Sequence, residues 1–332
     1  MAERVLLTGA AGFIGSHVAE ALLARGDAVV GLDSFDDFYP PAIKRANLAV
    51  AQAHPRFTLI EGDVRDSGEM RRAIADWKPA VIVHLAARAG VRPSIAQPAL
   101  YADVNVGGTV VLLQAAREAG VTRVVFGSSS SVYGDAATPP FREDDPAIAP
   151  ISPYAASKRG AELQCEAFSA IEAAMRIVTL RFFTVYGPRQ RPDLAIHTFT
   201  RLLEAGQPLP VFGDGSASRD YTYVSDIVTG VVAAVNRTRA VALRHEVINL
   251  GESAATTVAE LIALLEGATG RPATILRRPV QPGDVRRTCA DITRARTLLG
   301  YAPSVSVRAG LPRFVDWFRG HAATVLAAGG VR

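Results

Sequence analysis

The chain has 332 residues, 49% hydrophobic and 20% charged, which fits a globular protein of one large or two closely joined domains rather than a disordered or fibrous chain. No stretch approaches 18 uninterrupted apolar residues, and the first residues lack the pattern of a signal peptide, so we expect a cytoplasmic protein with no membrane partner. The net charge of +4 comes from scattered arginines, which argues against a nucleic-acid partner and is compatible with a small anionic substrate. Cys165 and Cys289 have neither disulfide nor metal-site spacing, and we predict no metal site.

Short β-branched segments alternate with amphipathic helical segments through the first two thirds of the chain. This pattern predicts an α/β fold with a Rossmann-type doubly wound parallel sheet. The predicted strands are Arg4–Leu7, Ala28–Leu32, Phe57–Glu61, Ala80–Leu85, Arg123–Gly127 and Ile177–Phe183. The predicted helices among them are Gly12–Arg25, Gly68–Trp77, Asn105–Ala119 and Tyr154–Ala170.

The alternation of predicted strands and helices ends at Gly187–Asp193, where glycine, proline and arginine predict a loop. We expect residues 1–186 to form a cofactor-binding domain, and residues 222–250 to rejoin it through a helix at Tyr223–Asn236 and a strand at Glu246–Leu250. Residues 187–221 and 251–332 are expected to form a smaller α/β substrate-binding domain. Its predicted helices are Thr256–Leu265, with a capping-box start, and Val307–Phe318.

A glycine-rich turn follows the first predicted strand and opens the first predicted helix. Its glycines, Gly9, Gly12 and Gly15, would allow a tight turn and close approach of backbone N–H groups to a pyrophosphate. Asp33 stands 18 residues after Gly15, at the end of the second strand, where a carboxylate can accept hydrogen bonds from ribose hydroxyls. Asp33 would repel a 2′-phosphate and Ser34 brings no positive charge, so NAD is favoured over NADP.

Tyr154 and Lys158 stand one helical turn apart in a chain that has three lysines against thirty-three arginines. On a helix these positions share a face, and an ammonium group near a phenol would lower the pKa of the phenol from about 10 and make it a usable general base. The alternative is an ordinary surface pair.

Together, these motifs resemble the extended short-chain dehydrogenase/reductase family over nearly the whole chain. The segment Phe126–Gly134 is similar to the serine segment of that family, and this resemblance implies that Ser129 joins Tyr154 and Lys158 as a catalytic residue. Ser128, Ser130 and Ser131 remain alternatives. The resemblance also implies the following NAD-binding residues: Gly9, Gly12, Phe13, Ile14, Gly15, Asp33, Ser34, Asp63, Val64, Leu85, Ala86, Arg88, Asn105, Tyr154, Lys158 and Phe183.

Other segments resemble the nucleotide-sugar branch of the family: Arg181–Pro188, with Thr184 where asparagine is usual, Phe212–Gly215, Arg219–Tyr221 and Pro282–Arg287. Gln281 stands where related epimerases often carry arginine, a charge that Arg287 could supply. The substrate-binding residues implied by this resemblance are Arg92, Ser128, Ser129, Ser130, Thr184, Arg191, Val211, Phe212, Arg219, Asp284 and Arg287.

Within that branch, the chain looks most like the UDP-glucuronate 4-epimerases. The similar segments are Leu32–Tyr39, Ile43–Arg45, Ala89–Ser94, Thr184 and Gly187–Asp193. The resemblance implies NAD-dependent epimerisation at C4 of UDP-glucuronate to UDP-galacturonate, by a homodimer that associates through the Asn105–Ala119 and Tyr154–Ala170 helices. The acid that 4,6-dehydratases and decarboxylases carry before Val132 is replaced by Ser130 and Ser131. A UDP-glucose/galactose 4-epimerase, a UDP-glucuronate decarboxylase and a non-catalytic NAD-binding protein remain alternatives.

Overall fold

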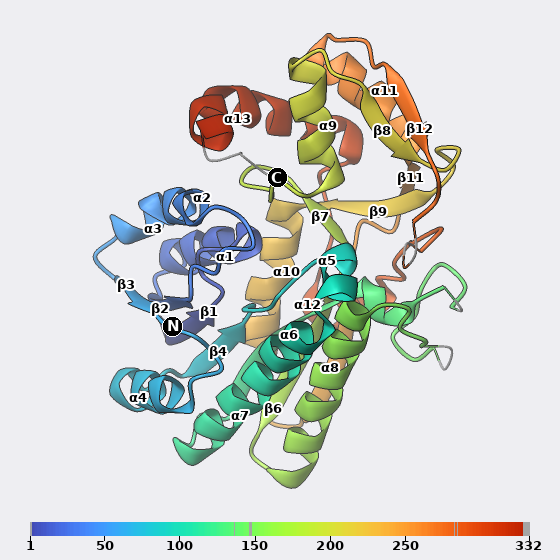
Figure 1. The fold of residues 1–332 in the computed structure, drawn as a ribbon. Helices are drawn as coiled ribbons and strands as arrows, with labels where there is room; N and C mark the ends of the chain where they lie inside the picture. Colours follow the sequence, from blue (N-terminus) through green and yellow to red (C-terminus); the bar gives the residue numbers. More distant parts are fainter. Residues whose placement is uncertain (1, 136, 146–147, 282, 284, 328–332) are drawn as a thin grey trace.

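A seven-stranded, fully parallel sheet forms the centre of the molecule (Figure 1). The computed structural model of the chain describes residues 2–135, 137–145, 148–281, 283 and 285–327. The strand order is β10-β6-β5-β4-β1-β2-β3, which is the doubly wound order with one further strand, and the predicted fold class is confirmed. The bounds are β1 Arg4–Thr8, β2 Ala28–Asp33, β3 Phe57–Glu61, β4 Val81–His84, β5 Arg123–Ser129, β6 Arg176–Phe182 and β10 His245–Leu250.

Helices cover both faces of this sheet because its central strands are apolar on both sides. Every residue of β4 is buried, as are four of the five in β1. One core contains α1 (Phe13–Ala24), α10 (Val224–Arg237) and α12 (Thr293–Leu299). The other contains α4 (Ser67–Trp77), α7 (Gly108–Glu118) and α8 (Pro153–Ile171).

The helix predicted at Asn105–Ala119 starts earlier than expected. Three segments follow one another without a break, namely α6 (Pro98–Ala102), the π turn Asp103–Gly107 and α7. Within the described residues, this helix of 21 residues is long and apolar enough to span a membrane, and 44% of its apolar window is buried. Its buried residues include Leu112 and Leu113, which pack in the core shared with α4 and α8.

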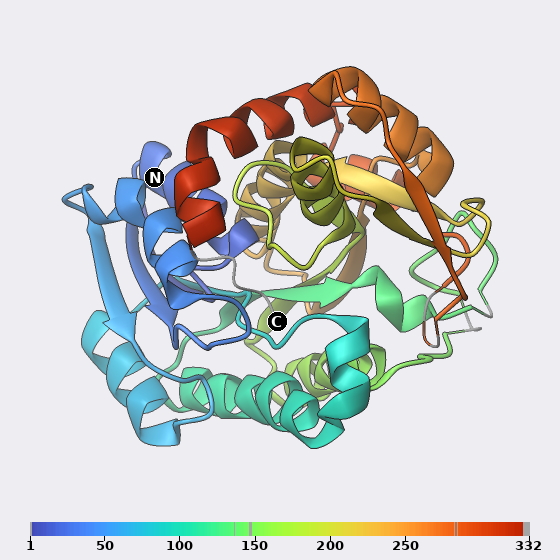
Figure 2. The same cartoon turned by 45° about the horizontal axis from the view of Figure 1, so that its top comes forward.

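A smaller part of the structure lies beyond the carboxyl ends of the strands. It holds a three-stranded sheet, β11-β9-β7, and a two-stranded sheet, β12-β8. Figure 2 shows α11 and α13 on the opposite side of the molecule from α7 and α8. The bounds are β7 Thr184–Tyr186, α9 Ala195–Glu204, β8 Leu209–Phe212, β9 Ser218–Tyr223, β11 Ala255–Thr257, α11 Val258–Thr269, β12 Ile275–Arg278 and α13 Val307–Ala327.

The chain passes between the two parts several times. After Phe182 it leaves the large sheet, and β7 pairs with β9. It then returns through α10, which packs against α1, and through β10, which pairs with β6 from His245 to Leu250. The short helices α2 (Pro41–Asn47), α3 (Ala49–Gln52) and α5 (Val91–Ala96) belong to the connections after β2 and β4.

Candidate active site

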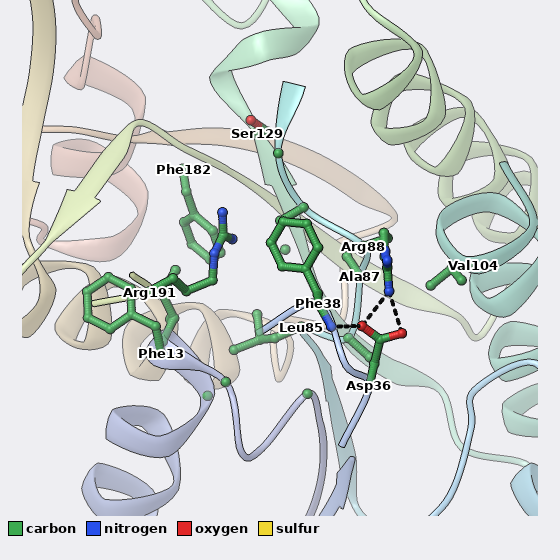
Figure 3. Close-up of a pocket in the computed structure, with 18 of the residues that line it drawn as sticks. Phe13, Asp36, Phe38, Leu85, Ala87, Arg88, Val104, Ser129, Phe182 and Arg191 are labelled. Atoms are coloured by element: carbon green, nitrogen blue, oxygen red, sulfur yellow. Dashed lines mark hydrogen bonds and ion pairs between the residues drawn. The ribbon is translucent and has the colours of Figure 1, made fainter. Parts of the chain in front are cut away.

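A cavity of about 460 Å³ lies at the carboxyl ends of the parallel strands, where the strand order reverses between β1 and β4. Ligands bind in this crevice in open α/β sheets. The lining residues come from the segments that follow β1, β2, β3, β4, β5 and β6, so one cavity gathers residues from across the first 194 positions. Figure 3 shows 18 of them.

The glycine-rich turn after β1 is too tightly packed for side chains. Gly9 has a φ of +71°, and a Cβ there would lie 2.7 Å from the backbone nitrogen of Ala86. A Cβ on Gly15 would lie 2.0 Å from the carbonyl oxygen of Gly9. The turn therefore brings the amino end of α1, with its free backbone N–H groups, to the cavity wall, which suits a pyrophosphate.

The Asp33 carboxylate at the end of β2 is held in place by the backbone. Its Oδ2 accepts from the Ala11 N–H and its Oδ1 from the Phe35 N–H, both at 2.9 Å. Lys44, which also lines the cavity, is buried, and burial lowers the pKa of its ammonium while Asp33 and Asp36 raise it. The carboxylate keeps lone pairs for ribose hydroxyls. The turn and Asp33 together fit the adenosine diphosphate half of NAD.

Ser129, Tyr154 and Lys158 all line the cavity. Ser129 ends β5, and its Oγ accepts from the Ser131 N–H at 3.2 Å at the start of the 3₁₀ turn Ser130–Tyr133. Tyr154 is in the first turn of α8, where the Ser152 side chain caps the helix. Tyr154 also hydrogen-bonds with Ser129.

The electrostatics of this trio differ from the sequence-based expectation. Burial raises the pKa of Tyr154 above its usual value, and the hydrogen bond with Ser129 and the charge of Arg191 oppose this rise without cancelling it. Lys158 Nζ donates to the Gly127 carbonyl oxygen at 2.6 Å, and burial lowers the pKa of Lys158 to about 8. The expected lowering of the tyrosine pKa by Lys158 was therefore wrong for this structure, because Ser129 and Arg191 supply the lowering influences.

Behind the trio lies a buried carboxylate, Glu162, one turn after Lys158 on α8. Arg181 on β6 donates to both of its oxygens at 2.9 Å, Ser128 Oγ donates to Oε1 at 2.6 Å, and Arg159 donates to Oε2 at 2.9 Å. Burial alone would raise the pKa of Glu162, but these donors bring it below its ordinary value. Ser128 lines the cavity with its hydroxyl committed to Glu162.

Thr184 and Arg191 line the same cavity, together with Ser130. Arg191 makes a two-pronged ion pair with Asp193, with Nε–Oδ1 and Nη2–Oδ2 distances of 2.9 Å. Its guanidinium influences the pKa values of both Tyr154 and Tyr39, so its charge acts inside the cavity. A cation and short hydroxyls thus share this cavity with Tyr154.

The remaining predicted substrate residues that the structure describes lie outside this lining. The Arg92 guanidinium is 4.6 Å from the Phe212 ring centroid at the end of β8, next to the buried Val211. Arg219 on β9 donates to the Ser218 carbonyl oxygen at 2.9 Å, and Arg287 is exposed. Asp284 lies outside the described residues.

The predicted NAD-binding residues line the cavity with one exception, Asn105. The Asn105 amide instead holds the backbone of Arg88, accepting from its N–H at 2.7 Å and donating to its carbonyl oxygen at 3.0 Å. Among the lining residues missed as site residues are four polar or aromatic ones from the connection after β2, namely Asp36, Phe38, Tyr39 and Lys44. These four residues lie in the segments Leu32–Tyr39 and Ile43–Arg45, which the sequence analysis used for the family resemblance and not for the site. Within the described residues, no group of three or more potential metal-ligating side chains gathers.

Comparison with known proteins agrees with this geometry. The family model described as GDP-mannose 4,6 dehydratase matches residues 6–314. The UDP-glucuronate 4-epimerase of Thermodesulfobacterium geofontis is 37% identical over 313 residues, which cover 94% of this chain and 95% of that protein.

Two solved structures are similar over 96% of this chain and 99% of their own. One is UDP-glucuronic acid 4-epimerase from Bacillus cereus in complex with UDP-glucuronic acid and NAD, with 37% identity and a TM-score of 0.89. The other is UDP-glucose 4-epimerase from Thermotoga maritima with UDP-glucose, with 34% identity and a TM-score of 0.87. The chain therefore belongs to the GDP-mannose 4,6 dehydratase family, and with it to the extended short-chain dehydrogenases/reductases.

Proposed function

We propose that this protein is a UDP-glucuronate 4-epimerase, which interconverts UDP-glucuronate and UDP-galacturonate through a 4-keto intermediate with bound NAD as cofactor. The observation that carries the proposal is the placement of Thr184 and Arg191 in the same cavity as Ser129, Tyr154 and Lys158. The first two suit a sugar carboxylate, and the other three suit oxidation of a sugar hydroxyl. The Bacillus cereus and Thermodesulfobacterium geofontis relatives support this choice of substrate.

The chemistry divides between cofactor and protein. NAD, when bound, supplies reversible hydride exchange with C4 of the sugar. In the oxidation, Tyr154 removes the proton of the C4 hydroxyl while Ser129 hydrogen-bonds the oxygen, and in the return step Tyr154 gives the proton back. Lys158, charged below a pH of about 8, adds positive potential at this end of the cavity.

The 4-keto intermediate must keep its carboxylate, which it could otherwise lose as carbon dioxide. A ketone at C4 is β to the C6 carboxylate, and such acids lose carbon dioxide when the breaking C–C bond aligns with the carbonyl π system. We propose that the hydroxyls of Ser129, Ser130 and Thr184, with the Arg191 guanidinium, hold the carboxylate out of that alignment. All four residues line the cavity.

We assign the nucleotide end of the substrate to the smaller part of the chain, residues 187–221 and 251–332. Val211 and Phe212 at the end of β8 offer a platform for the base. The cations Arg219 and Arg287, joined by Arg92 from the large part of the chain, suit a diphosphate. Firm holding of the nucleotide with weaker contacts to the sugar would let the keto sugar turn over between the two hydride transfers. Asp284 belongs to the same predicted set.

We also propose a cytoplasmic homodimer. The outward side of α8 carries Ala156, Gly160, Leu163 and Ala167 at helical spacing, and Leu163 is 48% exposed. Small and apolar residues at this spacing suit a helix–helix contact between two copies of α7 and α8. Both cysteines are free, as is usual in the cytoplasm.

The proposed function is tested by assaying the purified enzyme with no NAD added. We expect conversion of UDP-glucuronate to UDP-galacturonate, resolved by anion-exchange chromatography. Conversion of UDP-glucose alone would show a UDP-glucose 4-epimerase, and release of a pentose nucleotide would show a decarboxylase. Tyr154→Phe should abolish nearly all turnover while NAD and UDP still bind, and unchanged activity would rule out the assigned catalytic residue.

A further inference from the structure

Two arginines of the cavity lie against one aromatic ring. The Arg88 guanidinium is 5.1 Å from the Phe38 ring centroid and the Arg191 guanidinium is 5.4 Å from it, close enough for cation–π attraction to each. All three residues line the cavity, and Figure 3 shows the Phe38 ring between the two arginine side chains. Phe38 lies in the connection after β2, Arg88 in the one after β4, and Arg191 in the one after β7.

Ion pairs fix both ends of this arrangement. Arg88 pairs with Asp36, whose carboxylate also accepts from the Phe38 N–H at 2.8 Å, so the ring and its first arginine share one anchor. Arg191 pairs with Asp193 at 2.9 Å. The result is a row of five residues, Asp193, Arg191, Phe38, Arg88 and Asp36, which we call the arginine–phenylalanine row.

The row limits where the Arg191 guanidinium can lie. Arginine has a long, flexible side chain, and a group that must meet a substrate carboxylate binds better when its position is set in advance. Asp193 holds two of its nitrogens, and the Phe38 face covers the guanidinium from another direction. The ring also lies close to the backbone of Gly90, where a Cβ would be 3.4 Å from its Cζ.

We propose that Phe38 is a specificity-determining positioning residue, whose ring holds Arg191 where it meets the carboxylate of an acidic UDP-sugar. This inference rests on the proposed function. Phe38 does not touch the reacting atoms in this scheme. It acts through Arg191, and its loss should weaken recognition of the carboxylate while recognition of the nucleotide persists.

The test compares the binding of three ligands, UDP, UDP-glucose and UDP-glucuronate, in the NAD-containing Tyr154→Phe enzyme by calorimetry. With Phe38→Leu added, we expect the dissociation constant of UDP-glucuronate to rise between about twofold and thirtyfold, the range of a cation–π contact. The constants for UDP and UDP-glucose should stay within about twofold. Phe38→Tyr keeps the aromatic face and should restore the discrimination.

Phe35→Leu is the matched control. Phe35 lies three residues earlier, stacks on Arg45 with its ring centroid 4.2 Å from the guanidinium, and is absent from the cavity lining. The same substitution there should leave all three constants unchanged. If Phe38→Leu folds poorly, as judged by its NAD content and thermal midpoint, Phe38→Met replaces it.

Equal weakening of all three ligands by Phe38→Leu, or no change for UDP-glucuronate, would overturn the proposal. These outcomes differ from a failure of the proposed function, which would appear in the parent enzyme as absent turnover of UDP-glucuronate before any change at Phe38.

Discussion

Glu162 links the catalytic segment to the interior of the molecule. The residue is fully buried on α8, and its carboxylate binds Arg181 on β6 and Ser128 on β5, so three elements meet at one charge. A buried ion pair contributes little net stability, because the desolvation of both charges offsets their attraction. Its value here is electrostatic, since the Glu162 charge favours the ammonium form of Lys158, which burial disfavours.

Replacement of Glu162 by glutamine should therefore lower the pKa of Lys158 further below its value of about 8. The chain has three lysines, Lys44, Lys78 and Lys158, so a protein labelled with ¹³Cε-lysine gives three signals whose pH titrations NMR can follow. We expect the Lys158 signal to titrate at a lower pH in Glu162→Gln and the alkaline limit of turnover to move in the same direction.

Glu166→Gln, one turn further along α8 at an exposed position, is the matched control and should leave Lys158 unchanged. A Lys158 titration that is identical in Glu162→Gln and the parent protein would remove Glu162 from this role.

Part of the site was predictable residue by residue, because its chemistry is local. Tyr154 and Lys158 share a helix face, and Asp33 ends a strand, so spacing alone places them. Phe38 and Tyr39 could not be placed in this way. They belong to a connection without periodicity, and their position in the cavity depends on contacts with Arg88 and Arg191, which lie far away in the sequence.

The start of α11 shows how strongly a local signal can determine one element. The Thr257 side chain accepts from the Glu260 N–H at 3.1 Å, and the Glu260 carboxylate accepts from the Thr257 N–H at 2.8 Å, which confirms the predicted capping box. Both residues act on backbone N–H groups that the helix itself cannot satisfy.

Thr257→Ala should lower the free energy of unfolding by about 1 kcal/mol, the usual cost of losing an N-cap side chain. Urea unfolding monitored by circular dichroism measures the difference. Thr257→Ser keeps the hydroxyl and should retain most of the stability. A loss as large in the serine variant as in the alanine variant would show that the methyl group, rather than the cap, matters.

Longer elements were predicted well, and short ones in the smaller part were not. The central strands of the large sheet are continuous apolar segments buried on both faces, a pattern that few other structures share. In contrast, β12 is exposed at all four residues, and β8 and β9 border glycine-rich turns, so neither hydrophobic alternation nor length distinguishes them from loops. Their pairing is decided by tertiary contacts.

At the scale of the whole molecule, buried neutral histidines should make stability depend on pH. Burial lowers the pKa of His84 to about 3 and that of His197 to about 4, each from an ordinary value of 6.5. Below pH 6.5 the unfolded chain takes up protons that the folded protein does not. The free energy of unfolding therefore falls as the pH drops from 6.5 towards 4, by about 1.4 kcal/mol per pH unit for each such histidine.

In His197→Phe, unfolding should take up one proton fewer, so the stability should depend less steeply on pH. The ring lies on α9 against Phe314 and Phe318 of α13, and its Nδ1 is buried with no hydrogen-bond partner in the structure, so an apolar ring suits the site. Urea unfolding between pH 6 and pH 5 should show a slope smaller by about 1.4 kcal/mol per pH unit than that of the parent protein. An unchanged slope would mean that His197 is charged in the folded state at these pH values.

The proposed dimer depends on the outer side of α8, where Ala156, Leu163 and Ala167 are exposed. Leu163 is 48% exposed at the centre of the stripe formed by Ala156, Gly160 and Ala167, and a carboxylate there would be desolvated on assembly without a partner. Leu163→Glu should therefore convert a dimer into a monomer in sedimentation equilibrium, with the fold retained by circular dichroism. Val241→Glu places the same charge at a site that is 82% exposed in the connection between α10 and β10, and this variant should remain dimeric. A parent protein that sediments as a monomer, or a Leu163→Glu variant that stays dimeric, would refute the α8 interface.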